Sequence, residues 1–343
     1  MFKVDFYESG KGETTILTFP DESIGVLDAY PSDKQSRPDI TSLVSNKKIR
    51  FICMSHPHDD HVNDLSAIFD SNHPEQFWHT IQATDRFFYG LPEYDTFNSP
   101  LKDFVERKKR EATESLINLF SRAKDKQVSQ MIVSSNTKEM CIAGVNIYFL
   151  APDIKTISQW GYKFQGWVSD ERKTMPDFNI LSTIIAFQYG ENVFVHGGDA
   201  LTTAWKRAYD VFSSYELKLA SLMKIPHHGA KNALFIGNKR PRTSYMRFFI
   251  PSAHLICFGN ATHPDREVWQ CLYRKSRNTY FLLNRYRPNT SRNPLNIPGG
   301  RSIDGDDLIC NSHVHAEWAY TGPISISGAN CQTCGKCKQL LVS

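Results

Sequence analysis

The stretch His56-Pro57-His58-Asp59-Asp60-His61 is the most distinctive segment of this sequence. It follows the apolar run Ile49–Met54, which is typical of a buried strand, so the histidines begin a loop at the end of that strand. Three of the 12 histidines fall within these six residues, and this clustering argues against a surface loop with chance histidines. Two histidines one residue apart can turn both imidazoles to one cation, while Asp60 and His61 face a second.

Imidazole and carboxylate groups together suit zinc, manganese or iron. Two such cations, roughly 3.5–4 Å apart, hold a bridging hydroxide that attacks a substrate, and they stabilise the oxygen that leaves. We therefore expect a metal-dependent hydrolase that uses the hydroxide of a dinuclear site. Its expected cofactors are two divalent ions, Zn²⁺ or Mn²⁺.

Other apolar runs also end on an aspartate or a histidine. Because strand ends that meet at one edge of a sheet form the binding sites of α/β proteins, these residues are further candidates for the same site. The runs and their terminal residues are 24–27 before Asp28, 193–196 before Asp199, 222–225 before His227 and His228, and 254–258 before His263.

The order of these motifs resembles the metallo-β-lactamase fold superfamily. Within it, the chain is most similar to the hydrolase domain of the competence DNA-internalisation (ComEC-like) proteins and their soluble relatives. The resemblance covers about residues 1 to 275. It rests on Gly10-Lys11-Gly12-Glu13, Leu27-Asp28, the 56–61 segment, Leu150-Ala151-Pro152, Asn179-Ile180-Leu181-Ser182, Gly198-Asp199-Ala200, His227-His228-Gly229 and Thr262-His263-Pro264.

The resemblance implies a role for each matching residue. Asp199 is the expected carboxylate between both metals, and His263 the expected last ligand of the metal at Asp60 and His61. Of His227 and His228, one is a candidate ligand and the other a general acid or an oxyanion donor, with Asp60 also at the catalytic centre. Asp28 is expected to orient a metal-binding histidine. The implied metal ligands are His56, His58, Asp60, His61, Asp199 and His263.

The chain departs from the superfamily pattern in one stretch that bears on the metals. Many relatives have a further histidine between the first motif and the bridging aspartate, where this chain has Asn179. His79 or His196 could replace it, although a histidine within a buried strand is more often a core residue. We therefore expect the cation at His56 and His58 to be held less tightly than the other. Ala230 and Thr262 also depart from the pattern, at the substrate wall.

The expected fold is a four-layer αβ/βα sandwich of two mixed sheets over residues 1–290. Residues 154–178 lack a clear period and are predicted to form a loop over one face. Residues 291–343 form a C-terminal extension, in which Cys331, Cys334 and Cys337 follow at intervals of three. With Cys310, or with His313 or His315, they would make a structural zinc site. An iron–sulfur cluster is the weaker reading because it needs a fourth cysteine, and an unliganded tail is the alternative.

Composition describes an ordinary globular protein, with 41% hydrophobic and 22% charged residues. The net charge of +4 is too small to indicate nucleic acid by itself. From Lys239 to Arg292, however, basic residues are interleaved with aromatics. That pattern suits a phosphate-containing substrate, nucleic acid among the candidates, and a solvated face is the alternative. No apolar run is long enough for a membrane helix, and the acidic N-terminus does not look like a signal peptide, so we expect a cytoplasmic protein.

These features favour phosphodiester hydrolysis, by a nuclease or a phosphodiesterase. One alternative is hydrolysis of another ester, a thioester or an amide. The other is a non-catalytic binding or effector subunit with a protein partner in a larger complex. The intact set of candidate ligands argues against this last alternative, since a lost site would tolerate replacement of its ligands.

Overall fold

The computed structural model describes residues 1–8, 12–30, 39–82, 115–169, 173–217, 219–235, 254–258, 263, 268, 279–282, 295–296, 302–303 and 314–328. Its helices and helical turns are α1 (Ile40–Val44), α2 (Asp59–Val62), α3 (Leu65–Ser71), α6 (Ile154–Ser169), η1 (Phe178–Leu181), α7 (Thr202–Ser214), η2 (His227–Gly229) and α8 (Lys231–Leu234). Residues 115–125 are also helical.

The described strands form two large sheets and a small one. The first sheet has the order β17-β16-β1-β2-β3-β4-β5-β6 and the second the order β13-β12-β11-β10-β9-β8-β7. Each sheet contains parallel and antiparallel neighbours: β3, β4, β5 and β6 are parallel in the first, and β10, β11, β12 and β13 in the second. Both sheets are therefore mixed, as predicted.

The first sheet consists of β1 (Phe2–Glu8), β2 (Glu13–Thr18), β3 (Ile24–Leu27), β4 (Ile49–Cys53), β5 (Gln76–His79), β6 (Ser129–Ile132), β16 (Val314–Trp318) and β17 (Ser325–Gly328). The second consists of β7 (Met140–Ile142), β8 (Val145–Ala151), β9 (Ile184–Tyr189), β10 (Asn192–His196), β11 (Leu222–Lys224), β12 (His254–Phe258) and β13 (Thr279–Leu282). A separate pair is β14 (Leu295–Asn296) with β15 (Ser302–Ile303).

The two sheets pack face to face through an aromatic core. Because side chains alternate along a strand, each sheet turns one row of apolar residues toward the other. Phe51 of β4 stacks on Trp78 of β5 with ring centroids 3.6 Å apart, and it also stacks at 6.5 Å on Phe187 of β9, in the other sheet. This layer gives the molecule its central core.

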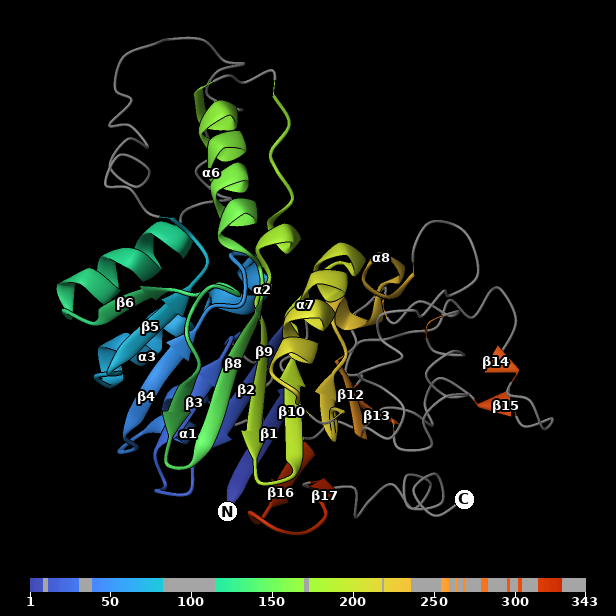
Figure 1. The fold of residues 1–343 in the computed structure, drawn as a ribbon. Coiled ribbons are helices and arrows are strands. Elements are labelled where there is room, and N and C mark those ends of the chain that lie inside the picture. Colours follow the sequence, from blue (N-terminus) through green and yellow to red (C-terminus); the bar gives the residue numbers. More distant parts are fainter. Residues whose placement is uncertain are drawn as a thin grey trace.

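Helices cover the outer faces of both sheets (Figure 1). Phe69 of α3 packs against Phe77 of β5 on one side, and Trp205 of α7 packs with Val195 of β10 on the other. The chain is thus helix, sheet, sheet, helix in section, and the predicted four-layer αβ/βα sandwich is confirmed.

Residues 154–178 were expected to form a loop, and that expectation is wrong for most of the segment, because α6 spans 16 residues of it. The apolar residues Ile157, Trp160, Phe164 and Trp167 follow helical spacing and are buried. Two glycines and several polar residues on the other side of the helix obscure this period. Figure 1 shows α6 extending beyond the ends of the strands.

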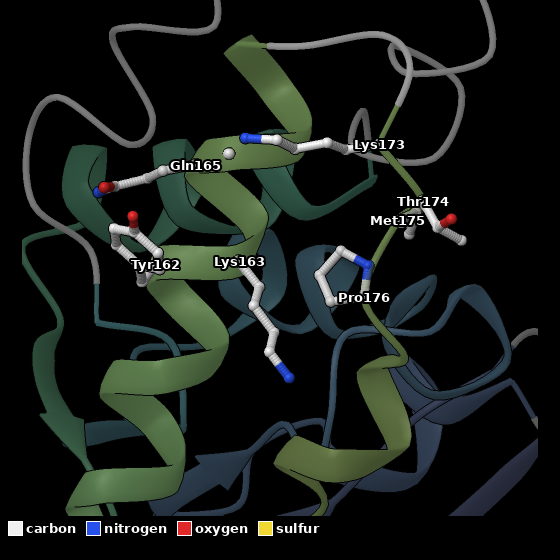
Figure 2. A pocket seen from close by; sticks show the side chains of 8 residues that line it. Tyr162, Lys163, Gln165, Lys173, Thr174, Met175 and Pro176 are labelled. Carbon is white, nitrogen blue, oxygen red and sulfur yellow. The ribbon is translucent and has the colours of Figure 1, made fainter.

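A hollow of about 730 Å³ lies between α6 and the segment 173–176 that follows it. Its lining includes Lys163 and Lys173, as Figure 2 shows. On its opposite face α6 meets η1, since Trp160 packs on Phe178 at 5.1 Å between ring centroids.

The C-terminal part of the described chain joins the first sheet. β16 pairs with β1 in antiparallel register, with Phe2 opposite Trp318. The two strands lie far apart in the sequence. The predicted boundary at residues 290 and 291 remains a prediction. Cys310, His313, Cys331, Cys334 and Cys337 lie outside the described residues. Within the described residues, no helix is both long and apolar enough to cross a membrane.

Candidate metal centre

The candidate site lies where parallel strands of both sheets end. Asp28 follows β3, His56 follows β4, Asp199 follows β10 and His227 follows β11. A hydrogen bond of 2.9 Å from the backbone N–H of Asp28 to the carbonyl of Cys53 ties the first two strand ends together. The strand ends meet at one edge of the sandwich, as the sequence predicts.

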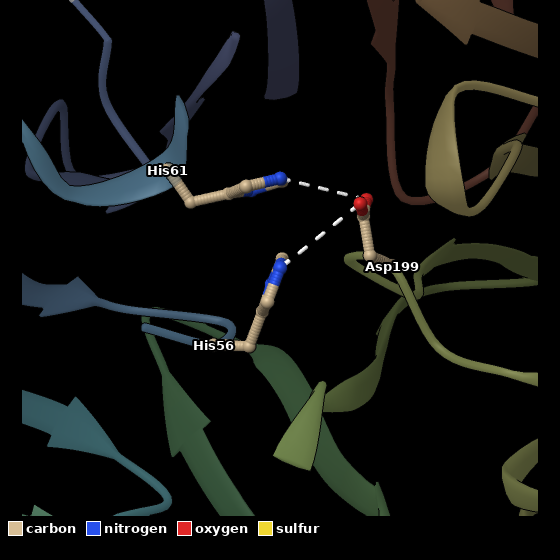
Figure 3. Close-up of side chains that lie close together, drawn as sticks. All are labelled: His56, His61 and Asp199. Atoms are coloured by element: carbon tan, nitrogen blue, oxygen red, sulfur yellow. Dashed lines mark ion pairs between the residues drawn. The ribbon is translucent and has the colours of Figure 1, made fainter. Parts of the chain in front are cut away.

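One group of metal-compatible side chains consists of His56, His61 and Asp199, which face one another in Figure 3. Nε2 of His61 lies 3.5 Å from Oδ1 of Asp199, and Nε2 of His56 lies 4.0 Å from Oδ2. All three residues are buried. Nδ1 of His58, which is also a predicted ligand, lies 2.9 Å from Nε2 of His56, next to this group.

A second group consists of Asp60, His61 and His228. Nε2 of His228 is 3.3 Å from Oδ2 of Asp60 and 4.0 Å from Oδ2 of Asp199. His61 belongs to both groups. Asp199, a member of the first group, also lies 4.0 Å from His228 of the second. Both groups consist of imidazole nitrogens and carboxylate oxygens, the donors that bind divalent cations.

The imidazole of His61 is oriented by Asp28. The carboxylate of Asp28 accepts hydrogen bonds from Nδ1 of His61 at 2.8 Å, from the backbone N–H of Ser55 at 2.7 Å and from the Ser55 hydroxyl at 2.6 Å. Because a carboxylate only accepts, Nδ1 of His61 carries a proton and Nε2 faces the site. Ser55 Oγ is in turn 3.1 Å from Nδ1 of His56, which leaves Nε2 of His56 toward the same space. The predicted role of Asp28 agrees with these contacts.

The backbone around these side chains has an unusual conformation. His227 and His228 have φ angles of 49° and 50°, a region that ordinary residues rarely occupy. Gly198 has φ of 47°, and a Cβ there would lie 2.8 Å from Ser55 Oγ, so glycine is required beside Asp199. Strain of this kind persists where the surrounding structure holds it, and it gathers at functional sites.

Burial and charge act in opposite directions on the pKa values of this site. Burial lowers the pKa of His61, but the carboxylates of Asp28 and Asp199 outweigh it and raise that pKa well above its usual value. Burial also lowers the pKa of His56, here without being outweighed, so its ring is neutral and able to bind a cation. Burial opposes ionisation of Asp199, yet the neighbouring His61 and His228 hold its pKa well below the usual range.

Several predicted residues lie outside the two groups. His227 is next to them, with Nε2 3.7 Å from Oδ2 of Asp199, and its side chain is 19% exposed. The His263 ring lies 5.8 Å from that of His227. Its predicted role as the last ligand remains a prediction, while His228 occupies the place beside Asp60 and His61. Asn179 is buried in η1.

The two histidines offered as replacements for Asn179 differ in their surroundings. His79 is in neither group and packs among aromatic rings, and burial lowers its pKa to about 4. His196 is buried with Glu13 and Asp28, and burial and Lys224 lower its pKa to about 3. The lysines and arginines of the stretch 239–292 lie outside the described residues.

Sequence reasoning missed the importance of two buried charged residues at this edge. Glu13 begins β2 and lies 3.5 Å from Nδ1 of His61, and Lys224 ends β11 and forms an ion pair with Glu13. Glu13 was visible only as the acid of a turn motif. Lys224 stands in an apolar strand directly before the His-His-Gly motif, and this position was the available signal.

The side chains present fit a pair of divalent cations. Nε2 of His61 and Oδ1 of Asp199 are buried and make no hydrogen bond within the described residues, although they lie 3.5 Å apart. Buried polar atoms are normally bonded, and a shared cation would satisfy both. The donors are imidazole nitrogens and carboxylate oxygens, the set that Zn²⁺ and Mn²⁺ accept.

No protein-family model matches the chain, and a search of curated proteins finds no relative. Solved structures whose backbone resembles this chain include a metallo hydrolase from Ignicoccus hospitalis. It has 11% identity and a TM-score of 0.42, and the match covers 79% of this chain and 91% of that chain. A metal-dependent hydrolase of the β-lactamase superfamily has 10% identity, coverages of 82% and 96%, and a TM-score of 0.43. Zn²⁺-bound PqqB from Methylobacterium extorquens has 9% identity, coverages of 83% and 98%, and a TM-score of 0.43. Values this low carry no inference about activity, and the resemblance to ComEC-like proteins remains a prediction.

Proposed function

We propose that this protein is a metal-dependent hydrolase that binds two divalent cations, Zn²⁺ or Mn²⁺, and cleaves a phosphodiester. The observation that carries the proposal is the pair of overlapping donor groups, His56, His61 and Asp199 with Asp60, His61 and His228. A single histidine nitrogen binds one cation. Because Nδ1 of His61 is bonded to Asp28, its Nε2 would hold one cation only, and Asp199 is the residue within reach of both donor groups.

Under this proposal His61 joins Asp60 and His228, and His56 and His58 face the other side of Asp199. Oδ1 of Asp199 faces His61, and Oδ2 lies 4.0 Å from both His56 and His228, so the carboxylate is within reach of both donor groups. Two divalent ions held in this way supply Lewis acidity and activate water at neutral pH. The protein contributes the fixed orientation of its ligands, through Asp28 and Ser55.

The adjacent histidines take different roles in the proposal. His228 is 2% exposed at its side chain and touches Asp60, so it is assigned as a ligand. His227 is 19% exposed, lies outside both donor groups and remains within 3.7 Å of Asp199. A partly exposed imidazole beside the reacting group can protonate a leaving oxygen, and we assign His227 as that general acid.

The choice of a phosphodiester rests on the groups around the site. An alkoxide leaving group needs the proton that His227 can deliver. Lys163 and Lys173 line the hollow beside α6, and the helix contacts the site through Phe178, whose ring is 5.4 Å from that of His58. This hollow lies on the face of α6 opposite to η1, so the two lysines are not part of the metal centre, and the phosphodiester assignment rests on the proton that His227 can deliver.

The test is hydrolysis by the full chain after loading with Zn²⁺ or Mn²⁺. The substrates are bis-p-nitrophenyl phosphate, single-stranded and duplex DNA, RNA, a thioester and a lactam. We expect cleavage of the phosphodiesters, a loss of at least about 100-fold in rate for Asp199→Ala, and no change for Asp210→Ala, which alters an exposed aspartate. Cleavage of the thioester or the lactam alone would replace the phosphodiester assignment.

A second comparison tests the roles of the two histidines. His227→Ala should retain bound metal and lose turnover, most strongly for poor leaving groups, whereas His228→Ala should lose metal. The exposed His73→Ala variant is the matched control. A loaded wild-type protein that bound metal and cleaved none of the substrates would favour a binding or effector subunit.

A further inference from the structure

A buried lysine stands beside the candidate metal centre. Lys224 is 0% exposed, and its ammonium donates a hydrogen bond of 2.7 Å to the carbonyl of Gly198. It also forms an ion pair with Glu13, and Nζ lies 3.8 Å from Oδ1 of Asp199. All three of its partners are buried or adjacent to a proposed ligand.

The Gly198 carbonyl joins two loops that carry site residues. It accepts from Nζ of Lys224 and, at 3.1 Å, from the backbone N–H of His227. Gly198 immediately precedes Asp199, and Lys224 is three residues before His227. The ammonium therefore connects the end of β10 to the end of β11, at the point where both leave the sheet.

The ion pair with Lys224 also balances the negative charge of Glu13 beside the site. Glu13, Asp28 and His196 form a third group with ligand-like spacing. The ammonium of Lys224 forms an ion pair with Oε1 of Glu13, so this carboxylate already has a buried cationic partner. Glu13 is thereby neutralised and Asp199 is left for the metals.

We propose that Lys224 is a positioning residue that holds the loop of Asp199 in register with His227, separately from its pairing with Glu13. This inference rests on the proposed metal site and deepens it. If Lys224 served only to neutralise Glu13, replacing both residues with neutral ones would leave metal binding unchanged. If Lys224 holds Gly198, the same double replacement weakens metal binding, because the Gly198 carbonyl loses its side-chain donor.

This difference defines the experiment. The variants are Lys224→Met, Glu13→Gln and the double variant, with Lys206→Met as an exposed control. Lys224→Met alone leaves the Glu13 charge buried without its partner and is expected to lower the melting temperature strongly. The double variant removes both charges and should recover most of that loss. Zn²⁺ affinity is then measured by competition with a chromophoric chelator.

We expect the double variant to bind Zn²⁺ about 10–100-fold more weakly than Glu13→Gln, the range for groups that orient metal ligands. Equal affinities in these two variants would overturn the proposal, as would a double variant that fails to fold. Amide hydrogen exchange gives a readout without metal: the His227 N–H should exchange at least about tenfold faster in the double variant than in Glu13→Gln. If wild-type protein bound no Zn²⁺, the proposed function would fail, and the exchange comparison would still decide the role of Lys224.

Discussion

Replacing Asp28 with asparagine is the sharpest test of how the metal centre is oriented. The carboxylate of Asp28 is fully buried and accepts from Nδ1 of His61 and from both donors of Ser55. Asparagine has nearly the same shape but offers an NH₂ group in place of one oxygen. That NH₂ can donate to Nδ1 of His61, which moves the ring proton to Nε2, the nitrogen that faces Asp199.

The magnitude follows from this tautomer switch. A cation at Nε2 must first displace the proton and restore a tautomer that the asparagine disfavours. We expect metal affinity to fall about 10–100-fold, which corresponds to about 1.4–2.8 kcal/mol. Loss of the charge-assisted hydrogen bond should also destabilise the metal-free protein, by about 1–3 kcal/mol.

Metal affinity is measured by chelator competition, and stability by urea unfolding with and without metal. Asp210→Asn, on the exposed face of α7, is the matched control and should change neither quantity. A twofold or smaller change in the affinity of Asp28→Asn would refute the claim that Asp28 sets the tautomer of His61.

Four further outcomes are expected. Gly12→Ala should destabilise the fold by about 1–3 kcal/mol and weaken metal binding, since a Cβ there meets the Asp60 carbonyl; urea unfolding and chelator titration measure both. Phe51→Ala should cost about 3–5 kcal/mol in urea unfolding, because its ring stacks with two other aromatic rings of the central core. His315→Gln should lower the melting temperature below about pH 6.5, because a hydrogen bond to Asp5 raises the pKa of His315. The stability that the charged His315 contributes is lost as pH rises through that raised pKa, so equal effects at pH 5 and pH 9 would contradict this. Removal of metal with a chelator should lower the melting temperature, and added Zn²⁺ or Mn²⁺ should restore it, with a stabilisation that grows with the logarithm of the metal concentration above Kd.

Some of the site could be predicted because local sequence determines it. A buried strand followed by closely spaced histidines requires no knowledge of distant contacts, and the same holds for strands that end on Asp28, Asp199 and His227. The repeated pattern of an apolar run that ends on Asp or His predicted that these strand ends meet at one site. The helix α6 was missed because its apolar residues are interrupted by glycines, and its period becomes decisive only when the buried face is known.

Other features depend on groups that are remote in the sequence. His227 and His228 are neighbours of the same chemical type, and the sequence left their roles open. The turn of η2 separates them by directing one ring into the protein and leaving the other partly exposed. Backbone conformation with positive φ is held by the surrounding structure, and residue type alone does not predict it.

The sequence by itself determined which side chains are candidate metal ligands and on which strand ends they stand, because ligand chemistry and strand periodicity are local properties. Only the tertiary structure decided how His56 to His61 are completed. It placed Asp199 between two donor groups, chose His228 as the neighbour of Asp60, and set Lys224 against Glu13 and Gly198. The physical reason is that a buried charge is stable only beside its partner, and that partner comes from another strand once both sheets have packed.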